Sequence, residues 1–181
     1  MIIHLVRHGE TASNGQSYAG RTDHAMTEAG HRQARLLSET LRHGPIGTVL
    51  TSPLRRARDT AAPVASAHGL IPIVAPDLME FDFGAYEGMS KQATGLRLRK
   101  DHLFKPVPGG ESLFDLWSRA GRIARRLRAL PDQSTDVVVV GHFWSNRLLF
   151  GRLMGFEFEP ACRNRDYRPE CGSAERISLM R

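Results

Sequence analysis

Residues 137–142 read VVVVGH, four consecutive valines that stop at a glycine and a histidine. A β-branched run of this kind predicts a strand, and its lack of apolar–polar alternation indicates that both faces of the strand are covered. Strands buried on both faces are typical of parallel sheets that carry helices on either side. We therefore take this stretch as a buried strand of an α/β fold.

The chain around this stretch alternates between strand patterns and helix patterns. Strands are predicted at residues 2–6, 48–51 and 70–74, with a final edge strand at 174–180. Apolar residues recur at helical spacing over 27–41, 54–65, 113–130 and 148–154. Ser52 and Pro53 are expected to begin the second of these helices. The order predicts a three-layer α/β/α sandwich with a mostly parallel central sheet.

The length of 181 residues is that of one compact domain, so residues 1–181 are expected to form a single unit. Polar and basic residues at about 85–110 indicate an excursion outside the sheet, which we interpret as a small cap insertion. Cys162 and Cys171 do not make a disulfide framework and are expected to be free thiols.

The formal charge of +6 is carried mainly by arginine. It is compatible with a solvated basic surface or with small acidic substrates. Nucleic acid is not the expected partner, because the arginines are dispersed and no zinc-finger or aromatic-basic repeat is present. Arg119, Arg122 and Arg126 are interpreted as a solvated helix face. No apolar run approaches the length of a membrane span and no basic leader is present, so we expect a cytoplasmic protein with no membrane partner.

Histidines and arginines follow the predicted strands. Ligands of open α/β sheets bind beyond the carboxyl ends of the strands. Arg7 and His8 follow the first run, His142 follows the valines, and arginines at 55, 56 and 58 follow the second run. The sequence therefore predicts two histidines and several arginines on one rim.

This combination is suited to phosphoryl transfer. Neutral imidazole can attack phosphorus, while guanidinium groups bind phosphate oxygens and stabilise the charge in transfer. The alternative is structural: a hydrogen-bonded histidine at a strand end and an exposed arginine face. His4, His8 and His142 could hold a metal, but no H-x-x-x-H or clustered Cys/His spacing supports this. We expect neither metal nor cofactor.

Six motifs occur in order along the chain. They read LVRHGET at 5–11, GRTD at 20–23, TEAGHRQA at 27–34, TSPLRRARDTA at 51–61, EFDFGAYEG at 80–88 and GGES at 109–112. Together with the valine strand and its histidine, they resemble the signature blocks of the histidine phosphatase superfamily, the phosphoglycerate mutase-like enzymes. The resemblance implies a phosphoglycerate mutase-like fold, and the 80–84 text looks like the phosphatase branch.

The resemblance also implies roles for individual residues. His8 is implied as the nucleophile that forms a phosphohistidine, and Glu80 as the proton donor to the leaving group. Spacing alone would not prefer Glu80 over Asp82 or Glu87, nor select Arg56 among its neighbours. The implied catalytic residues are Arg7, His8, Arg56, Glu80 and His142, and the implied substrate-binding residues are Arg7, Asn14, Gly20, Arg56 and His142.

The second histidine is followed by Phe143 and Trp144, where many relatives carry two small residues. Ser145 and Arg147 still fit the H-x-x-S-x-R form of some members. We hypothesise that Phe143, which we add to the substrate-binding set, or Trp144 narrows the pocket or contacts an organic leaving group. The alternative is that both side chains belong to the core.

The expected function is hydrolysis of a small phosphorylated metabolite, such as α-ribazole phosphate, a sugar phosphate or a phosphoglycerate-like compound. The enzyme would be a metal-independent phosphatase of the histidine acid type, with a homodimer left open. The alternatives are a phosphoglycerate mutase-type phosphotransferase and a non-catalytic regulatory member of the same fold.

Overall fold

The computed structural model describes residues 1–132, 134–164 and 167–178. Its strands are β1 (Ile2–Arg7), β2 (Ile46–Thr51), β3 (Ile73–Val74), β4 (Asp136–Gly141) and β5 (Ala174–Ser178). They form one sheet in the order β3-β2-β4-β1-β5, in which only β5 runs antiparallel to its neighbour. The valine strand β4 therefore lies at the centre of the sheet.

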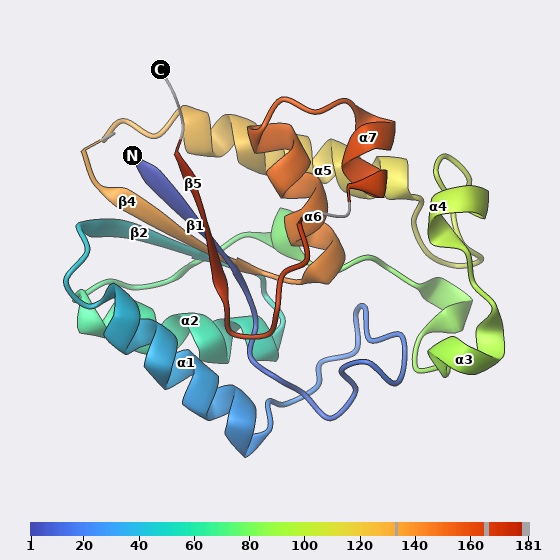
Figure 1. Cartoon of the computed structure of the whole chain (residues 1–181), viewed down its shortest axis with the longest axis horizontal. Helices are drawn as coiled ribbons and strands as arrows, with labels where there is room; N and C mark the ends of the chain where they lie inside the picture. The colour runs from blue at the N-terminus through green and yellow to red at the C-terminus, as the bar shows by residue number, and fades with distance from the viewer. Residues whose placement is uncertain (133, 165–166, 179–181) are drawn as a thin grey trace.

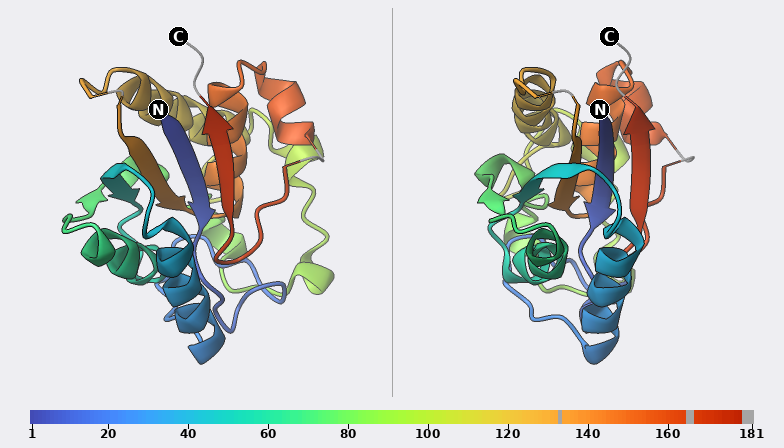
Figure 2. Two further views of the ribbon diagram at one scale, coloured as in Figure 1. Left: turned by 60° about the vertical axis from the view of Figure 1, so that its left-hand side comes forward. Right: turned by 90° about the vertical axis from the view of Figure 1, so that its left-hand side faces the viewer.

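Two pairs of helices cover the two faces of this sheet. They are α1 (Glu28–Leu41) with α2 (Arg55–Ala67), and α5 (Leu113–Arg128) with α6 (Phe143–Leu153). Figures 1 and 2 show the pairs on opposite sides of the sheet. Val138 and Val140 pack into the core beneath α1 and α2, whereas Val137 and Val139 pack into the core beneath α5 and α6. Burial of both faces explains the missing alternation, and the three-layer prediction is confirmed.

Shorter elements complete the chain. They are the 3₁₀ turns η1 (Pro76–Leu78) and η2 (Gly84–Tyr86), and the short helices α3 (Lys91–Thr94), α4 (Leu98–Asp101) and α7 (Phe158–Arg163). We call residues 85–110 the insert segment; its helices α3 and α4 lie beside the layers (Figure 1). No helix among the described residues combines the length and apolar character needed to cross a bilayer.

Several element boundaries differ from the sequence expectation. Helix α2 begins at Arg55 with Leu54 at its N-cap, so the prediction of Ser52 as cap is wrong. Ser52 still pairs with the sheet through its N–H, and its hydroxyl contacts a histidine described below. β3 covers only residues 73–74 of the predicted run, and β5 ends at 178, with residues 179 and 180 outside the described part of the chain.

Candidate active site

His8 lies directly after β1, at the carboxyl edge of the sheet. Its N–H donates to the carbonyl of Gly141, which holds the residue beside the end of β4. The ring nitrogen Nδ1 lies 2.7 Å from the carbonyl oxygen of Gly9. A carbonyl only accepts, so Nδ1 carries the proton and Nε2 keeps its lone pair. Nε2 accepts a hydrogen bond from Nε of Arg56 at 3.3 Å.

The environment keeps the His8 imidazole neutral. Burial and the charge of Arg56 lower the pKa of His8 to about 3, with Arg7 acting in the same direction. Removal from water and nearby positive charge both disfavour the imidazolium form. His8 therefore presents an unprotonated Nε2 throughout the neutral range.

Gly9 has a packing role at this turn. A Cβ on Gly9 would lie 2.6 Å from the carbonyl oxygen of Gly30 at the start of α1. Its N–H donates to Oγ1 of Thr60 on α2 at 2.9 Å. The missing side chain thus lets the histidine loop contact α1 and α2.

Arg56 is the buried member of its arginine cluster, with 1% of its surface exposed. Besides His8, its guanidinium donates to the carbonyls of Thr22 at 2.7 Å and Gly20 at 2.9 Å, with a longer bond to Ala19. Arg55 and Arg58 are exposed. The loop at 19–22 therefore aims one guanidinium at the histidine.

His142 follows β4 and is fully buried beside His8, with the ring centroids 5.0 Å apart. Its Nε2 lies 2.8 Å from the hydroxyl of Ser52, and Nδ1 has no hydrogen-bond partner among the described residues. Burial and the charge of Arg56 lower the pKa of His142 well below its usual value. Both histidines are therefore neutral, and the Arg56 guanidinium acts on both of them.

The carboxylate of Glu80 is held at the first turn of α6. It accepts hydrogen bonds from the N–H groups of Trp144 and Ser145 at 3.1 Å and from Phe81 at 2.8 Å. The N–H groups of Trp144 and Ser145 belong to the first turn of the helix, where they have no partner within the helix, and they fix the position of the carboxyl oxygens. His142 is the N-cap of the same helix, so one helix start positions both side chains.

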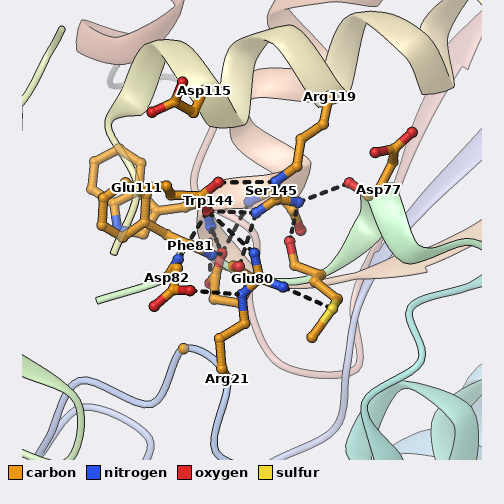
Figure 3. A network of polar contacts seen from close by, with 12 residues as sticks. Arg21, Asp77, Glu80, Phe81, Asp82, Glu111, Asp115, Arg119, Trp144 and Ser145 are labelled. Carbon is orange, nitrogen blue, oxygen red and sulfur yellow. Dashed lines mark hydrogen bonds and ion pairs between the residues drawn. The ribbon is translucent and has the colours of Figure 1, made fainter. Parts of the chain in front are cut away.

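The segment that carries Glu80 is held from behind by Arg119 of α5. The guanidinium donates to the carbonyls of Asp77 at 2.8 Å, Met79, and Glu80 at 2.8 Å (Figure 3). It also forms an ion pair of 2.7 Å with Glu111. Arg119 is 7% exposed, so the prediction of a solvated residue is wrong. Helical spacing places Arg119 on the polar face of α5. The spacing does not show that residues 77–80 pack over this side chain.

Glu111 extends this network to the neighbouring motif. Its Oε1 accepts the N–H of Asp82 at 2.9 Å and lies 3.8 Å from Arg21 (Figure 3). Arg21 lies at the same distance from the Asp82 carboxylate. These contacts join the GGES and EFDFG motifs. The Asp82 carboxylate lies near Arg21, whereas the Glu80 carboxylate is bound at the start of α6, so the two acidic side chains have different surroundings. Glu87 instead accepts the N–H of Thr22.

A cavity of about 870 Å³ opens over this arrangement. Arg7, His8, Arg56 and Glu80 line it, together with Asn14, Phe143 and Trp144. Phe143 and Trp144 therefore lie on the cavity wall, and Trp144 also packs against the core.

Asn14 and Gly20, two of the predicted substrate-binding residues, lie differently relative to the cavity. Asn14 lines the cavity, and its side-chain oxygen accepts from the N–H and hydroxyl of Thr11. Gly20 lies behind Arg56 and is not among the described residues of the wall. A Cβ there would approach the carbonyl oxygen of Phe81 to 2.1 Å.

The cavity has a basic side that was not predicted from the sequence. Lys91, Arg97, Arg99 and Lys100 of the insert segment line it, as do Tyr18 and Arg163. The cluster of basic residues near α3 and α4 was the available signal, but spacing cannot show that this segment faces His8.

Cys162 and Cys171 are free thiols, and burial raises the pKa of both. No group of three or more His, Cys, Asp or Glu side chains within the described residues is arranged to hold a metal ion.

Fold and site together define the class: an α/β protein with paired neutral histidines and a buried arginine at the rim of its sheet. The model of the histidine phosphatase superfamily (branch 1) matches residues 3–166. The chain belongs to this family.

Individual relatives agree with this assignment. The adenosylcobalamin/alpha-ribazole phosphatase of Salmonella typhimurium is 32% identical, over 99% of this chain and 91% of its own length. A Yersinia pestis protein described as a probable phosphoglycerate mutase, GpmB, is 30% identical over 98% of this chain and 85% of its own length. Mycobacterial relatives are 37% identical over 154 residues, and the chain spans 42% of their length.

A solved structure extends the likeness to three dimensions. The mycobacterial glucosyl-3-phosphoglycerate phosphatase Rv2419c, in its complex with VO3, superposes with a TM-score of 0.85. The match covers 98% of this chain and 90% of that chain at 26% identity. The relatives named here thus include two proteins described as phosphatases.

Proposed function

We propose that this protein is a metal-independent phosphate monoester hydrolase of the histidine acid phosphatase type, acting through a phosphohistidine on His8. The observation that carries the proposal is the neutral His8 imidazole, whose Nε2 lone pair lies beside the Arg56 guanidinium in the cavity. Residues 1–181 act as one catalytic domain, with the insert segment as its cap. The substrate is a small phosphorylated metabolite.

In the first step, the Nε2 lone pair of His8 attacks phosphorus and forms the N–P bond. The P–O bond to the leaving alcohol breaks, its electron pair goes to the leaving oxygen, and Glu80 supplies the proton. Such proton transfer contributes about 10²–10⁴-fold to the rate. Arg7, Arg56 and His142 contact the phosphoryl oxygens, with Asn14 assisting, and the guanidinium charges stabilise the transferring group.

In the second step, water attacks phosphorus while Glu80 accepts a proton from it. The N–P bond breaks, its electron pair returns to Nε2 and inorganic phosphate is released. Glu80 is protonated again and His8 is neutral again, so both groups are ready for another substrate. The main-chain N–H groups around Glu80 keep its carboxyl at the same place in both steps.

Rapid acid and base quenching of turnover tests this proposal. With ³²P-labelled 4-nitrophenyl phosphate, we expect a protein-bound adduct that is acid-labile and base-stable and that maps to His8. His8→Ala should form none and should lose turnover, whereas Arg126→Gln, an exposed change on α5, serves as the matched control. Activity in EDTA should equal activity without it. A His8→Ala variant as active as the parent would instead indicate a non-catalytic site.

Phosphoglycerate mutase activity is the second candidate, because the Yersinia relative is described as a mutase. A mutase must retain its phosphorylated intermediate and exclude water. Isomerisation of 3-phosphoglycerate, measured with and without 2,3-bisphosphoglycerate, separates the two. Inorganic phosphate without isomerised product supports the hydrolase.

A further inference from the structure

The insert segment places positive charge on the side of the cavity formed by α3 and α4. Lys91, Arg97, Arg99 and Lys100 all line the cavity, and Glu80 is the only carboxylate among the described lining residues. Glu80 is already occupied by three main-chain N–H groups. The charge of this wall is therefore not balanced from inside the cavity.

The cations of the insert segment differ in their partners. Arg97 pairs with Asp101 at 3.2 Å. Within the described part of the chain, Lys91, Arg99 and Lys100 form no ion pair with a carboxylate. Lys91 instead lies 6.0 Å from the ring centre of Tyr18, and Arg99 lies 5.7 Å from that of Trp144. These two cations are thus held against aromatic walls.

The cavity is also larger than a phosphoryl group requires. Its volume of about 870 Å³ is near the upper end of the range for pockets that bind whole small-molecule ligands. Arg7, Arg56 and His8 account for the phosphoryl end, whereas Lys91 and Arg99 come from a different segment of the chain.

We propose that Lys91 and Arg99 form a second anion subsite, and that the substrate is a sugar-sized or larger organic phosphate with a second anionic group on its leaving portion. This inference rests on the proposed function, since it concerns the leaving portion of the same substrate. The second group is a carboxylate or a phosphate, both of which a guanidinium and an ammonium group bind. The aromatic faces of Tyr18 and Trp144 contact the body between the two charged ends.

Matched substrate pairs test the subsite. 6-Phosphogluconate against glucitol 6-phosphate isolates a carboxylate, and glucose 1,6-bisphosphate against glucose 6-phosphate isolates a second phosphate. We expect the wild-type enzyme to have a higher kcat/KM for the member with the second anionic group in at least one pair, mainly through a lower KM. The pair that shows the preference identifies the anion. The preference should decrease as NaCl is raised, because the two cations are exposed and salt screens them.

The double variant Lys91→Gln/Arg99→Gln should reduce that preference about fivefold, the upper range for solvent-exposed ion pairs. Its kcat/KM for the member without the second anionic group should fall less than its kcat/KM for the member that carries it. Arg126→Gln, which removes an exposed charge outside the cavity, should leave the preference unchanged. Equal kcat/KM within both wild-type pairs, or a preference that survives the double variant, overturns the subsite. Formation of the His8 adduct in the same samples shows separately whether the proposed function holds.

Discussion

Arg119 and Glu80 are joined through the main chain: Nη2 of Arg119 donates to the carbonyl oxygen of Glu80 across 2.8 Å. The same guanidinium holds the carbonyls of Asp77 and Met79 and pairs with Glu111. A buried group on α5 therefore sets the path of the segment that ends in the Glu80 carboxyl. Arg119 acts on the site as a positioning residue and does not line the cavity within the described residues.

Arg119→Lys and Arg119→Met should weaken protonation of the leaving group. We expect kcat/KM for an alkyl phosphate to fall by up to about 10²-fold, the lower range for general acid catalysis. The loss should be smaller for 4-nitrophenyl phosphate, whose leaving group needs little protonation. Glu80→Gln should show the same dependence on the leaving group. Steady-state kinetics with both esters measures the effect.

Arg126→Met is the matched control for this series, because Arg126 is exposed on the same helix. Thermal melts identify any variant that fails to fold, and Arg119→Lys keeps the charge that pairs with Glu111. An equal loss on the alkyl and aryl esters in Arg119→Lys would mean that Arg119 only stabilises the fold.

The pH dependence of stability should report the buried histidines. The pKa values of His4, His8 and His142 are lowered in the folded protein, mainly by burial, from a usual value of 6.5. The unfolded chain therefore binds more protons below that pH, so the stabilisation present above 6.5 is lost as pH falls. Each histidine contributes a slope of up to about 1.4 kcal/mol per pH unit.

Urea titrations between pH 7 and pH 5 measure this slope above the usual range of carboxyl titration. His8→Asn removes one titrating group, so the slope of stability against pH should decrease by up to about 1.4 kcal/mol per pH unit. The kcat/KM profile should also show no loss near pH 6.5 from protonation of His8, because its pKa is about 3. A stability that does not change over this range would contradict the neutral state of the histidine pair.

Trp144→Ala should change the order of substrates. Trp144 lines the cavity and faces Arg99, so its removal takes away an aromatic surface for the leaving group. We expect kcat/KM for 1-naphthyl phosphate to fall about twofold to tenfold relative to glycerol phosphate, the range of an aromatic contact. Phe143→Ala provides the comparison, because it removes the neighbouring ring of the same wall. An unchanged order in both variants would show that these rings serve only packing.

Gly20→Ala should disturb Arg56 without altering any charged group. The new Cβ would lie 2.1 Å from the carbonyl oxygen of Phe81 and 2.8 Å from the ring of Phe83. The loop that supplies the Arg56 acceptors must shift, at a cost of about 1–3 kcal/mol in stability. Urea unfolding and kcat/KM should both decline.

Gly44→Ala is the control for this substitution, because its nearest contact would be an ordinary 3.4 Å. It should leave kcat/KM unchanged. If Gly20→Ala unfolds at the wild-type urea concentration, the close approach at residue 20 is wrong.

The sequence predicted the layers because burial on both faces leaves a local mark: β4 has no polar residue between Val137 and Val140. It also brought His8 and His142 to one edge, since both follow parallel strands. Long-range packing leaves no such mark. Arg119 has the same local context as a solvated helix residue, and its partners lie 8 to 42 positions away. The cationic wall of the cavity likewise depends on how the insert segment turns back toward His8.

The shared start of α6 has a consequence for changing what this protein acts upon. His142 is the N-cap of α6, and the next main-chain N–H groups bind the Glu80 carboxyl. A displacement of α6 would therefore move His142 and Glu80 together. Mutations in α6 that change substrate preference would therefore also disturb His142 and Glu80 together, and catalytic activity would be lost with the original preference. In the described part of the chain, helices α3 and α4 of the insert segment form no hydrogen bond with His142 or Glu80, so libraries confined to these two helices offer a route to altered substrate preference.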